Sequence, residues 1–447
     1  MKKIFIIILS TGFLMSSCSK KLEILPTQSI DESIVFTSDA NIKAALVGAY
    51  DGVSAASLFG GDLQLYSELQ AADGEIRWAG TFNQPREIYL KDILTNNSYV
   101  TATYNRAYYT INICNNILAA IDIVDEDDRD RVKGEALFIR GTVYFELVKL
   151  YAKPYSGGNM STPGLQLITT PTLGNISESN FVPRSSLADT YALILADLTQ
   201  SKSLLPGQND VYATTYAASA ILSRVYLQMA DYPKARDEAN TIIESDEFAL
   251  NSTYAAAFNN TSNSPEDIFA IQVTAQDGSN DMFVFWSTLP NGARDGDVDV
   301  LNKHISLYDT ADARLGLFFP DGVNIFRSGK WRLQYRNLSI VRLAEMYLTR
   351  AECNFRLGTA VGATPDEDIN ETIRDRAALG PVAITLASIL FERKLELAHE
   401  GQAIHDVKRL KGNVDGFAFD AKELVFPIPI REINAVGDIL EQNEGYN

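Results

Sequence analysis

Cysteine and histidine are scarce in this sequence, and their scarcity excludes several kinds of site. The cysteines and histidines among its 447 residues are Cys18, Cys114, Cys353, His304, His399 and His405. Three cysteines cannot build a disulfide framework or a cysteine metal cluster. His399 and His405 do not have the three- or four-residue spacing of paired metal ligands on one helix face. We therefore expect no metal site. Because no glycine-rich phosphate loop or nucleophile elbow occurs, we expect no cofactor either.

Basic residues and long apolar runs are also in short supply. Lysine and arginine together number 39 against 57 aspartates and glutamates, which gives a formal net charge of −18. Such a surface repels phosphate backbones, so we expect no nucleic-acid partner. No internal segment reaches the roughly 18 consecutive apolar residues of a membrane-spanning helix. What the sequence does contain is 46% hydrophobic and 10% aromatic residues, which is enough for a large folded core.

The N-terminus has the pattern of a bacterial lipoprotein export signal. Two lysines precede an apolar run, and Ser16-Ser17-Cys18 follows it. Small residues before a cysteine at this place are typical of a cleavage site whose cysteine becomes the new, acylated N-terminus. We expect residues 1–17 to be removed as a signal peptide, Cys18 to carry lipid such as palmitate, and residues 18–40 to form a tether. An ordinary signal peptide with an incidental cysteine is the alternative.

Helical periodicity dominates the rest of the chain. Between Leu338 and Leu379, apolar residues recur every three or four positions on two successive segments, so each segment has one apolar face. Gly358 suits a left-handed C-cap between them, and Thr364 with Glu367 forms a capping box for the second. Further helices are expected over 41–50, 104–123, 129–151, 185–204, 216–229, 233–243 and 385–400, and a strand over 267–274.

Amphipathic helix pairs need similar neighbours to cover their apolar faces. We therefore predict a mostly α fold. Tetratricopeptide-like helix pairs would form a scaffold, with irregular loops and a few short strands on one side. The chain would divide into a helical part over 41–247 and a second part, with the ligand loops and the final helix pairs, over 248–447.

Two polar, irregular stretches, 67–98 and 280–299, contain aromatic residues and are the candidate binding surface. Sugar rings stack their apolar faces on aromatic planes, while amide, carboxylate and guanidinium groups bond their hydroxyls. The candidate ligand residues are Asp73, Arg77, Trp78, Asn83, Trp286, Asn291 and Arg294. The alternative is that each tryptophan packs against the edge of the scaffold, and the third tryptophan, Trp331, is expected to do so.

Three glutamates, Glu392, Glu396 and Glu400, repeat at four-residue spacing. Two carboxylates roughly 5–10 Å apart can hydrolyse a glycoside. Like charges at helical spacing, however, repel each other unless cations neutralise them. The arginines available on the preceding segments are Arg342, Arg350, Arg374 and Arg376. We therefore favour a structural charge network over a catalytic site, and we expect the protein not to be an enzyme.

A series of short motifs occurs along almost the whole chain. They are Cys18, Gly48-Ala49-Tyr50, Gly134-Glu135-Ala136, Pro183-Arg184-Ser185, Arg342 to Met346, Glu392-Arg393, Glu396-Leu397, Glu400-Gly401, Pro427-Ile428-Pro429 and Gln442-Asn443. Their order and spacing resemble the SusD/RagB family of Bacteroidetes outer-membrane lipoproteins. In this resemblance, 41–247 corresponds to the N-terminal SusD-like part and 248–447 to the C-terminal RagB/SusD part.

The resemblance implies a function. Members of that family sit as lids on a SusC-type TonB-dependent barrel transporter and capture nutrients, mostly glycans. It implies a non-catalytic protein, lipid-anchored in the cell outer membrane and facing outward, that binds an oligosaccharide and delivers it to such a barrel. Three alternatives stay open: a peptide-binding member of the same family, a periplasmic helical-repeat adaptor that binds only proteins, and a glycoside hydrolase.

Overall fold

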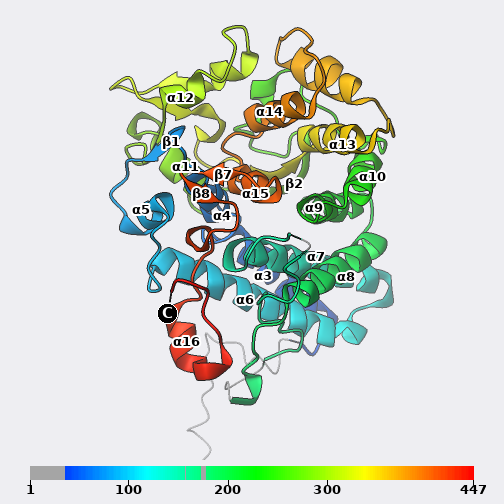
Figure 1. The fold of residues 1–447 in the computed structure, drawn as a ribbon. Helices are drawn as coiled ribbons and strands as arrows, with labels where there is room; N and C mark the ends of the chain where they lie inside the picture. Colours follow the sequence, from blue (N-terminus) through cyan, green and yellow to red (C-terminus); the bar gives the residue numbers. More distant parts are fainter. Residues whose placement is uncertain (1–35, 157, 173–177, 447) are drawn as a thin grey trace, which may run out of the picture.

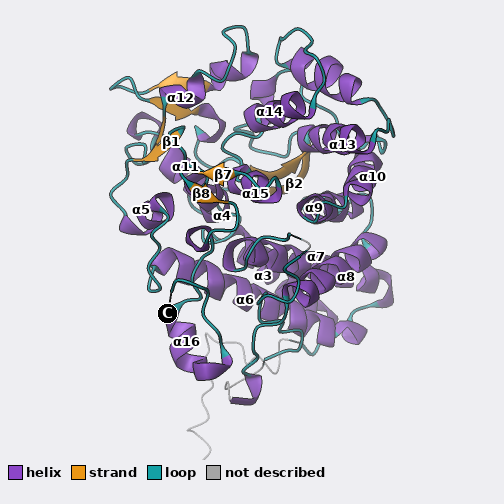
Figure 2. Ribbon diagram, in the orientation of Figure 1, coloured by secondary structure: helices purple, strands orange, loops and turns teal. Residues whose placement is uncertain are grey.

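A computed structural model describes residues 36–156, 158–172 and 178–446, and most of them are helical (Figures 1 and 2). The scaffold helices are α3 (Asp39–Ser54), α6 (Ser98–Ala119), α7 (Glu126–Tyr151), α8 (Leu187–Leu204), α9 (Thr215–Gln228), α10 (Tyr232–Ile243), α13 (Leu343–Leu357) and α14 (Leu386–Glu396). Each of them packs against the next in this order. In Figure 1 the stack runs from α3 and α6 through α9 and α10 to α13 and α14. The predicted mostly α fold is confirmed.

Local signals begin and end these helices where the sequence predicts. The Ser186 hydroxyl accepts the backbone N–H of Asp189 at 3.0 Å and caps α8. Gly358 ends α13 in the left-handed conformation, at φ 63°. Thr364 and Glu367 exchange both hydrogen bonds of the capping box, with the Thr364 N–H donating to Glu367 Oε2 at 2.7 Å.

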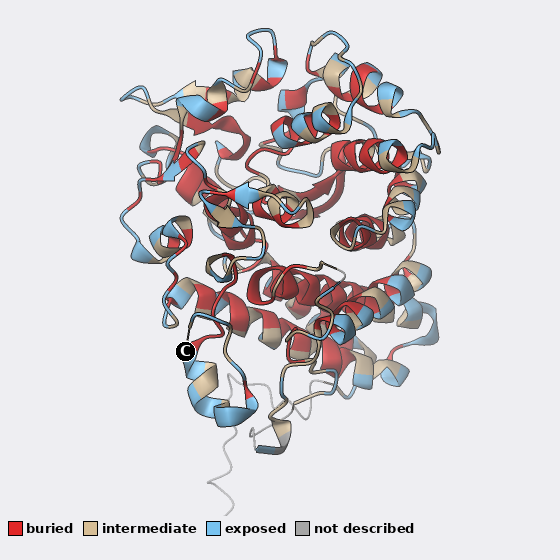
Figure 3. Ribbon diagram, in the orientation of Figure 1, coloured by how far each residue is buried: buried red, intermediate tan, exposed pale blue. Residues whose placement is uncertain are grey.

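One hydrophobic core connects the scaffold. Its buried residues extend from Ile42 on α3 to Leu440 near the C-terminus. Figure 3 shows buried residues around almost the whole circumference of α7 and along α9 and α13. Cys114 and Cys353 are buried free thiols within this interior. The division of the chain after residue 247 stays a prediction.

Two small antiparallel sheets lie beside the helices. The first has the order β1-β3-β5-β4, from β1 (Ile76–Trp78), β3 (Val298–Val300), β5 (Phe326–Ser328) and β4 (Phe318–Pro320). The second pairs β2 (Asp267–Ile271) with β6 (Leu338–Arg342). A two-stranded hairpin, β7 (Asn413–Val414) with β8 (Phe417–Ala418), comes late in the chain. The first sheet positions the candidate site because it joins segments more than two hundred residues apart.

Three local predictions were wrong. Residues 338–342 form strand β6 and not the start of a helix, because β2 supplies their backbone hydrogen bonds. The segment after the capping box winds as the π-helix η8 (Glu367–Arg374) within a longer helical stretch. The stretch 67–98 is not irregular throughout, because α4 (Asp62–Gln70) ends within it and α5 (Asn83–Leu90) lies inside it.

The acidic series forms the expected charge network with arginines. Glu396 Oε1 accepts from Arg342 Nη1 at 2.7 Å and also contacts Arg376. Arg350 does not join: its guanidinium pairs with Asp368 on η8 at 2.6 Å. The physical reason is that α13 begins at Leu343, so the helical rise of about 1.5 Å per residue carries Arg350 roughly 10 Å along the helix from the end that holds Arg342.

Four further short α-helices are α11 (Asp281–Trp286), α12 (Asn302–Ile305), α15 (Ala403–Arg409) and α16 (Ile430–Val436), and several 3-10 turns connect the elements. In Figure 1, α16 lies beside the C-terminus, at the opposite end of the molecule from α12 and α14. Each helix in the parts of the chain that the structure describes is too short or too polar to cross a bilayer. The predicted signal peptide, Cys18 and most of the tether lie outside the described residues.

Candidate ligand-binding site

The structure brings the two predicted binding stretches together. Strand β1 pairs with β3 so that Trp78 lies opposite Val298. The pairing continues beyond the strands, because the backbone N–H groups of Ala79 and Gly80 both donate to the carbonyl oxygen of Asp297, at 2.7 and 3.1 Å. The turn after β1 and the loop before β3 therefore form one surface.

An aromatic ring and a guanidinium group meet on that surface. The Arg294 guanidinium lies over the Phe82 ring, 4.2 Å from its centroid. Arg294 Nε also donates to Asp297 Oδ2 at 2.6 Å, and its Nη2 reaches Thr81 Oγ1 at 3.1 Å. The Phe82 side chain is still 37% exposed. We call Thr81, Phe82, Asn83 and Arg294 the Phe82 platform.

Buried groups hold the Phe82 platform in place. Phe285 on α11 meets the Phe82 ring edge-on, with the centroids 6.3 Å apart. Burial raises the pKa of Asp297, and the neighbouring Arg294 opposes that rise. An Arg–carboxylate hydrogen bond of this kind fixes the guanidinium plane. The cation is therefore positioned before any ligand arrives.

A pair of carboxyl groups lies next to this surface. Asp62 begins α4, and the backbone N–H of Asp281 on α11 donates to the Gly60 carbonyl oxygen at 2.8 Å, which places the two residues beside each other. Burial raises the pKa of Asp281 to about 6, and burial followed by the Asp281 charge raises that of Asp62 well above its ordinary value. Asp281 and Phe285 are on the same helix, α11, and Phe285 meets Phe82, so the pair lies close to the platform.

The expectation that Trp78 and Trp286 offer open ring faces is wrong. Trp78 is 4% exposed, because β1 alternates and turns it inward while Arg77 points outward. Trp286 is 0% exposed and stacks on His399 with centroids 4.5 Å apart. It belongs to α11, an apolar helix capped by Asn280 within a stretch that otherwise looks like a polar loop. Trp331 is buried as predicted, and its N–H donates to the His399 carbonyl at 2.9 Å.

The remaining candidate residues lie at different places, and only some of them are near Phe82. Asn83 is exposed and follows Phe82 in the chain, at the first position of α5. Arg77 is exposed but pairs with Asp299 on β3 at 2.5 Å. Asp73 precedes the N-terminal end of β1, at the end away from Phe82, and lies near Lys303. Asn291 donates to Ser287 and Thr288 within its own turn. Of the predicted set, Arg294 contacts the Phe82 ring and Asn83 adjoins Phe82 in the chain.

Phe82, the exposed ring of this surface, is not among the residues predicted from the sequence. The available signal was its position between two polar residues, Thr81 and Asn83, because a large apolar side chain in a polar turn is often exposed for a reason. The carboxyl pair was not predicted either, because Asp62 and Asp281 are far apart along the chain and nothing local predicts that they lie beside each other.

Neither acidic set has the geometry of a glycosidase. The Asp62 carboxyl is buried and accepts from the Tyr66 hydroxyl at 3.0 Å, whereas the two acids of a glycosidase stand about 5–10 Å apart on either side of an accessible scissile bond. Glu392 and Glu396 are buried against arginines. What the Phe82 platform can do is stack on a flat apolar face and hydrogen-bond the groups at its edge.

Two family profiles match the chain. One, described as "Starch-binding associating with outer membrane", matches residues 22–227, and the other, described as "SusD family", matches residues 327–424. Together they include the β1 turn of the platform and the α13–α14 region.

Relatives match over nearly the full length. The chain is 25% identical to SusD-like protein P2 of Formosa agariphila, over 99% of this chain and 99% of that protein. It is similar in structure to a SusD superfamily protein from Bacteroides vulgatus, with a TM-score of 0.81, 24% identity and coverage of 92% and 99% of the two chains. Surface glycan-binding protein A from Bacteroides fluxus gives a TM-score of 0.76 at 21% identity, over 92% and 100%. At these identities the two solved structures show a shared fold.

Proposed function

This chain belongs to the SusD family, and from that membership we propose that it is a non-catalytic protein that binds oligosaccharides at the outer membrane. It would deliver them to a SusC-like TonB-dependent barrel transporter. The name of a solved structure with the same fold, surface glycan-binding protein A, agrees with a glycan ligand.

The Phe82 platform is the observation that supports glycan binding most directly. A half-open ring fixed against Arg294, with Asn83 next in the chain, combines the two contacts that pyranose rings accept. A sugar would stack on the open part of the Phe82 ring, while the amide and guanidinium groups would bond its hydroxyls. Asp73, Arg77 and Asn291 do not contribute to the Phe82 platform, and their predicted ligand roles stay predictions.

Replacing Phe82 with alanine should weaken oligosaccharide binding by about tenfold or more, which corresponds to about 1.4 kcal/mol. Calorimetric titration of the mature protein with a panel of oligosaccharides and peptides would measure the change. The matched control is Tyr109→Ala, because Tyr109 on α6 is also exposed and also carries a guanidinium, that of Arg106, on its ring. Equal affinities for Phe82→Ala and the unmodified protein would contradict the assignment.

The same titration separates the alternatives. Binding of peptides in place of sugars, with the same sensitivity to Phe82, would identify a peptide-binding member of the family. Reducing ends released from any glycan would identify a hydrolase. An adaptor that binds only proteins would give no heat with either panel.

Attachment to the membrane is proposed to depend on lipid at Cys18, which lies outside the described residues. A body with net charge −18 is not attracted to an anionic bilayer, so the anchor would have to hold it there. Replacing Cys18 with serine should move the protein from the membrane fraction to the soluble periplasmic fraction. A serine variant that still sediments with membranes after a high-salt wash would contradict the lipid anchor.

Family membership is the support for proposing a barrel partner and an outward orientation. The profile over residues 22–227 describes association with the outer membrane, and a SusC-like transporter is the partner that family membership suggests. We propose that the ligand passes from the Phe82 platform to that transporter.

A further inference from the structure

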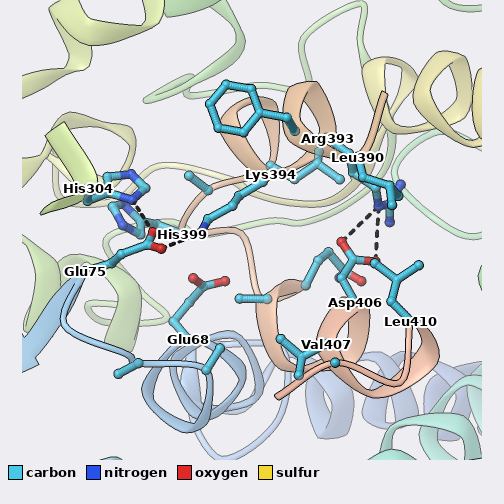
Figure 4. Close-up of a pocket in the computed structure, with 18 of the residues that line it drawn as sticks. Glu68, Glu75, His304, Leu390, Arg393, Lys394, His399, Asp406, Val407 and Leu410 are labelled. Carbon is cyan, nitrogen blue, oxygen red and sulfur yellow. Dashed lines mark hydrogen bonds and ion pairs between the residues drawn. The ribbon is translucent and has the colours of Figure 1, made fainter. Parts of the chain in front are cut away.

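A cavity lies apart from the Phe82 platform, with none of the platform residues in its lining. It has a volume of about 420 Å³ and opens between the end of α4, β1, α14 and α15 (Figure 4). Its apolar wall includes Ala71, Ile76, Leu390, Phe391, Val407 and Leu410. A mostly apolar cavity of this size with a few polar groups is typical of small-molecule sites.

Most charged groups in the wall already have partners. Glu75 accepts from His304 at 2.9 Å and contacts Lys394. Asp406 is bonded by Arg393 at 3.0 Å. Figure 4 shows these pairs at two opposite sides of the cavity. Their charges are neutralised within the wall, so they do not select the charge of a ligand.

Glu68 is different. Its side chain rises from α4 toward the middle of the cavity in Figure 4, and it is 5% exposed. Its carboxylate accepts the backbone N–H of Gly401 at 2.9 Å, and backbone N–H groups of Ala403 and His399 support it. Burial raises the pKa of Glu68 to about 7, while the Gly401 N–H and the Lys330 charge oppose that rise, so the carboxyl is ionised at pH 8. Lys330 acts on it only through space, since the Lys330 ammonium pairs with Glu400. Among the described residues, Glu68 is the acid in this wall without a cationic partner.

His399 supplies a second unpartnered polar group. Its ring lies between the rings of Trp286 and His304, with centroids 4.5 and 4.8 Å away. Neither ring nitrogen has a hydrogen-bond partner within the described chain, although the residue is buried. Burial, followed by the charges of His304 and Lys330, lowers the pKa of His399 well below its ordinary value. The ring is therefore neutral, and because both of its nitrogens are buried it presents neither a charge nor an acceptor to a ligand in the cavity.

We propose that this cavity binds a small amphiphilic amine, whose ammonium group pairs with Glu68 while its apolar body fills the space beside Leu390 and Val407. An anion would place a second negative charge beside Glu68 without a free cation to neutralise it. An uncharged alcohol would leave the Glu68 charge without a partner. This site is independent of the proposed oligosaccharide surface, because its lining residues do not include Thr81, Phe82, Asn83 or Arg294.

Three probes of similar shape test the charge preference. Phenethylamine, 2-phenylethanol and 3-phenylpropionate differ in carrying a positive, no or a negative charge at pH 8. Titrations of the mature protein should give a dissociation constant for phenethylamine at least tenfold below that for the alcohol, with the carboxylate weakest. Equal binding of the amine and the alcohol, tighter binding of the carboxylate, or no binding of phenethylamine would overturn the proposal.

Variants locate the site. Glu68→Gln should weaken phenethylamine at least tenfold and leave 2-phenylethanol within about threefold, because glutamine still accepts the Gly401 N–H. Glu87→Gln is the matched control, since Glu87 also accepts a backbone N–H, that of Leu94, but lies outside the cavity. Unchanged amine binding in Glu68→Gln would overturn the proposal.

A second variant covers the case in which Glu68→Gln fails to fold. Ala387→Trp adds a large ring at an exposed position on the cavity rim, and it should weaken both the amine and the alcohol. Amine binding that survives this variant unchanged would also overturn the proposal. Oligosaccharide titration of the same variant should match the unmodified protein, so a failure of this site and a failure of the Phe82 platform are distinguishable.

Discussion

Replacing Glu396 with glutamine should lower the free energy of unfolding by about 3–5 kcal/mol, because three arginines would lose their shared partner in the interior. Glu396 is fully buried on α14. It accepts from Arg342 at 2.7 Å, contacts Arg376 and lies 3.6 Å from Arg314. Glutamine has the same shape, so the expected loss comes from charge. Urea unfolding followed by circular dichroism would measure it.

The pH dependence gives the same prediction a second measurement. Burial opposes ionisation of Glu396, but the charges of Arg376, Arg342 and Arg314 outweigh it and hold its pKa at about 2. The unfolded carboxyl has its ordinary pKa of 4.5. The stabilisation is therefore complete above pH 4.5 and is lost as the pH falls toward 2. The stability difference between the unmodified protein and Glu396→Gln should shrink over that interval.

A more exposed ion pair is the control for this experiment. Lys202 and Glu238 join α8 to α10 at 2.7 Å with partly exposed side chains. Glu238→Gln should cost less than about 1 kcal/mol, because water screens such pairs. A similar small loss for Glu396→Gln would show that the buried network contributes little to stability.

Replacing Trp286 with alanine should lower the free energy of unfolding by about 3–5 kcal/mol through the cavity it leaves. Trp286 is fully buried at the end of α11 and stacks on His399 at 4.5 Å. It also connects α11, which carries Phe285 beneath the Phe82 platform, to the α14–α15 region. Thermal and urea unfolding should both register the loss, and weaker oligosaccharide binding should follow from the loosened α11.

Trp286→Phe separates packing from ligand contact. Phenylalanine keeps an aromatic ring in the interior and should cost much less stability than alanine, since part of the space stays filled. A folded Trp286→Phe protein should bind oligosaccharides as the unmodified protein does. A folded Trp286→Phe protein that has lost sugar binding would instead restore Trp286 as a ligand residue and contradict its assignment to the core.

Helix boundaries were predictable from the sequence because their causes are local. The Gly358 C-cap and the Thr364–Glu367 capping box each involve residues a few positions apart, and both formed as predicted. The four-residue repeat of the acidic series placed Glu392 and Glu396 on α14, but this helix ends at Glu396, so Glu400 lies beyond it. The repeat also could not show that Arg350 pairs with η8 instead.

The two stretches that form the candidate site were predictable from the sequence, but the positions and exposure of their side chains were not. The sequence marked 67–98 and 280–299 by their mixture of aromatic and polar residues, and the β1–β3 pairing joins them. Which ring would be open depended on partners far along the chain: His399 covers Trp286, and Phe285 meets both Trp78 and Phe82.

By itself the sequence determined the helices of this protein, their caps, its acidic surface and the two stretches that carry its candidate ligand residues. Tertiary structure alone decided that Phe82 stays open, that Trp286 is buried, that residues 338–342 extend as a strand, and that Glu68 lacks a cation. The physical reason is the separation along the chain of the residues that interact. Helical hydrogen bonds and caps connect neighbours within four residues, whereas burial and charge pairing depend on atoms that only the folded chain brings together.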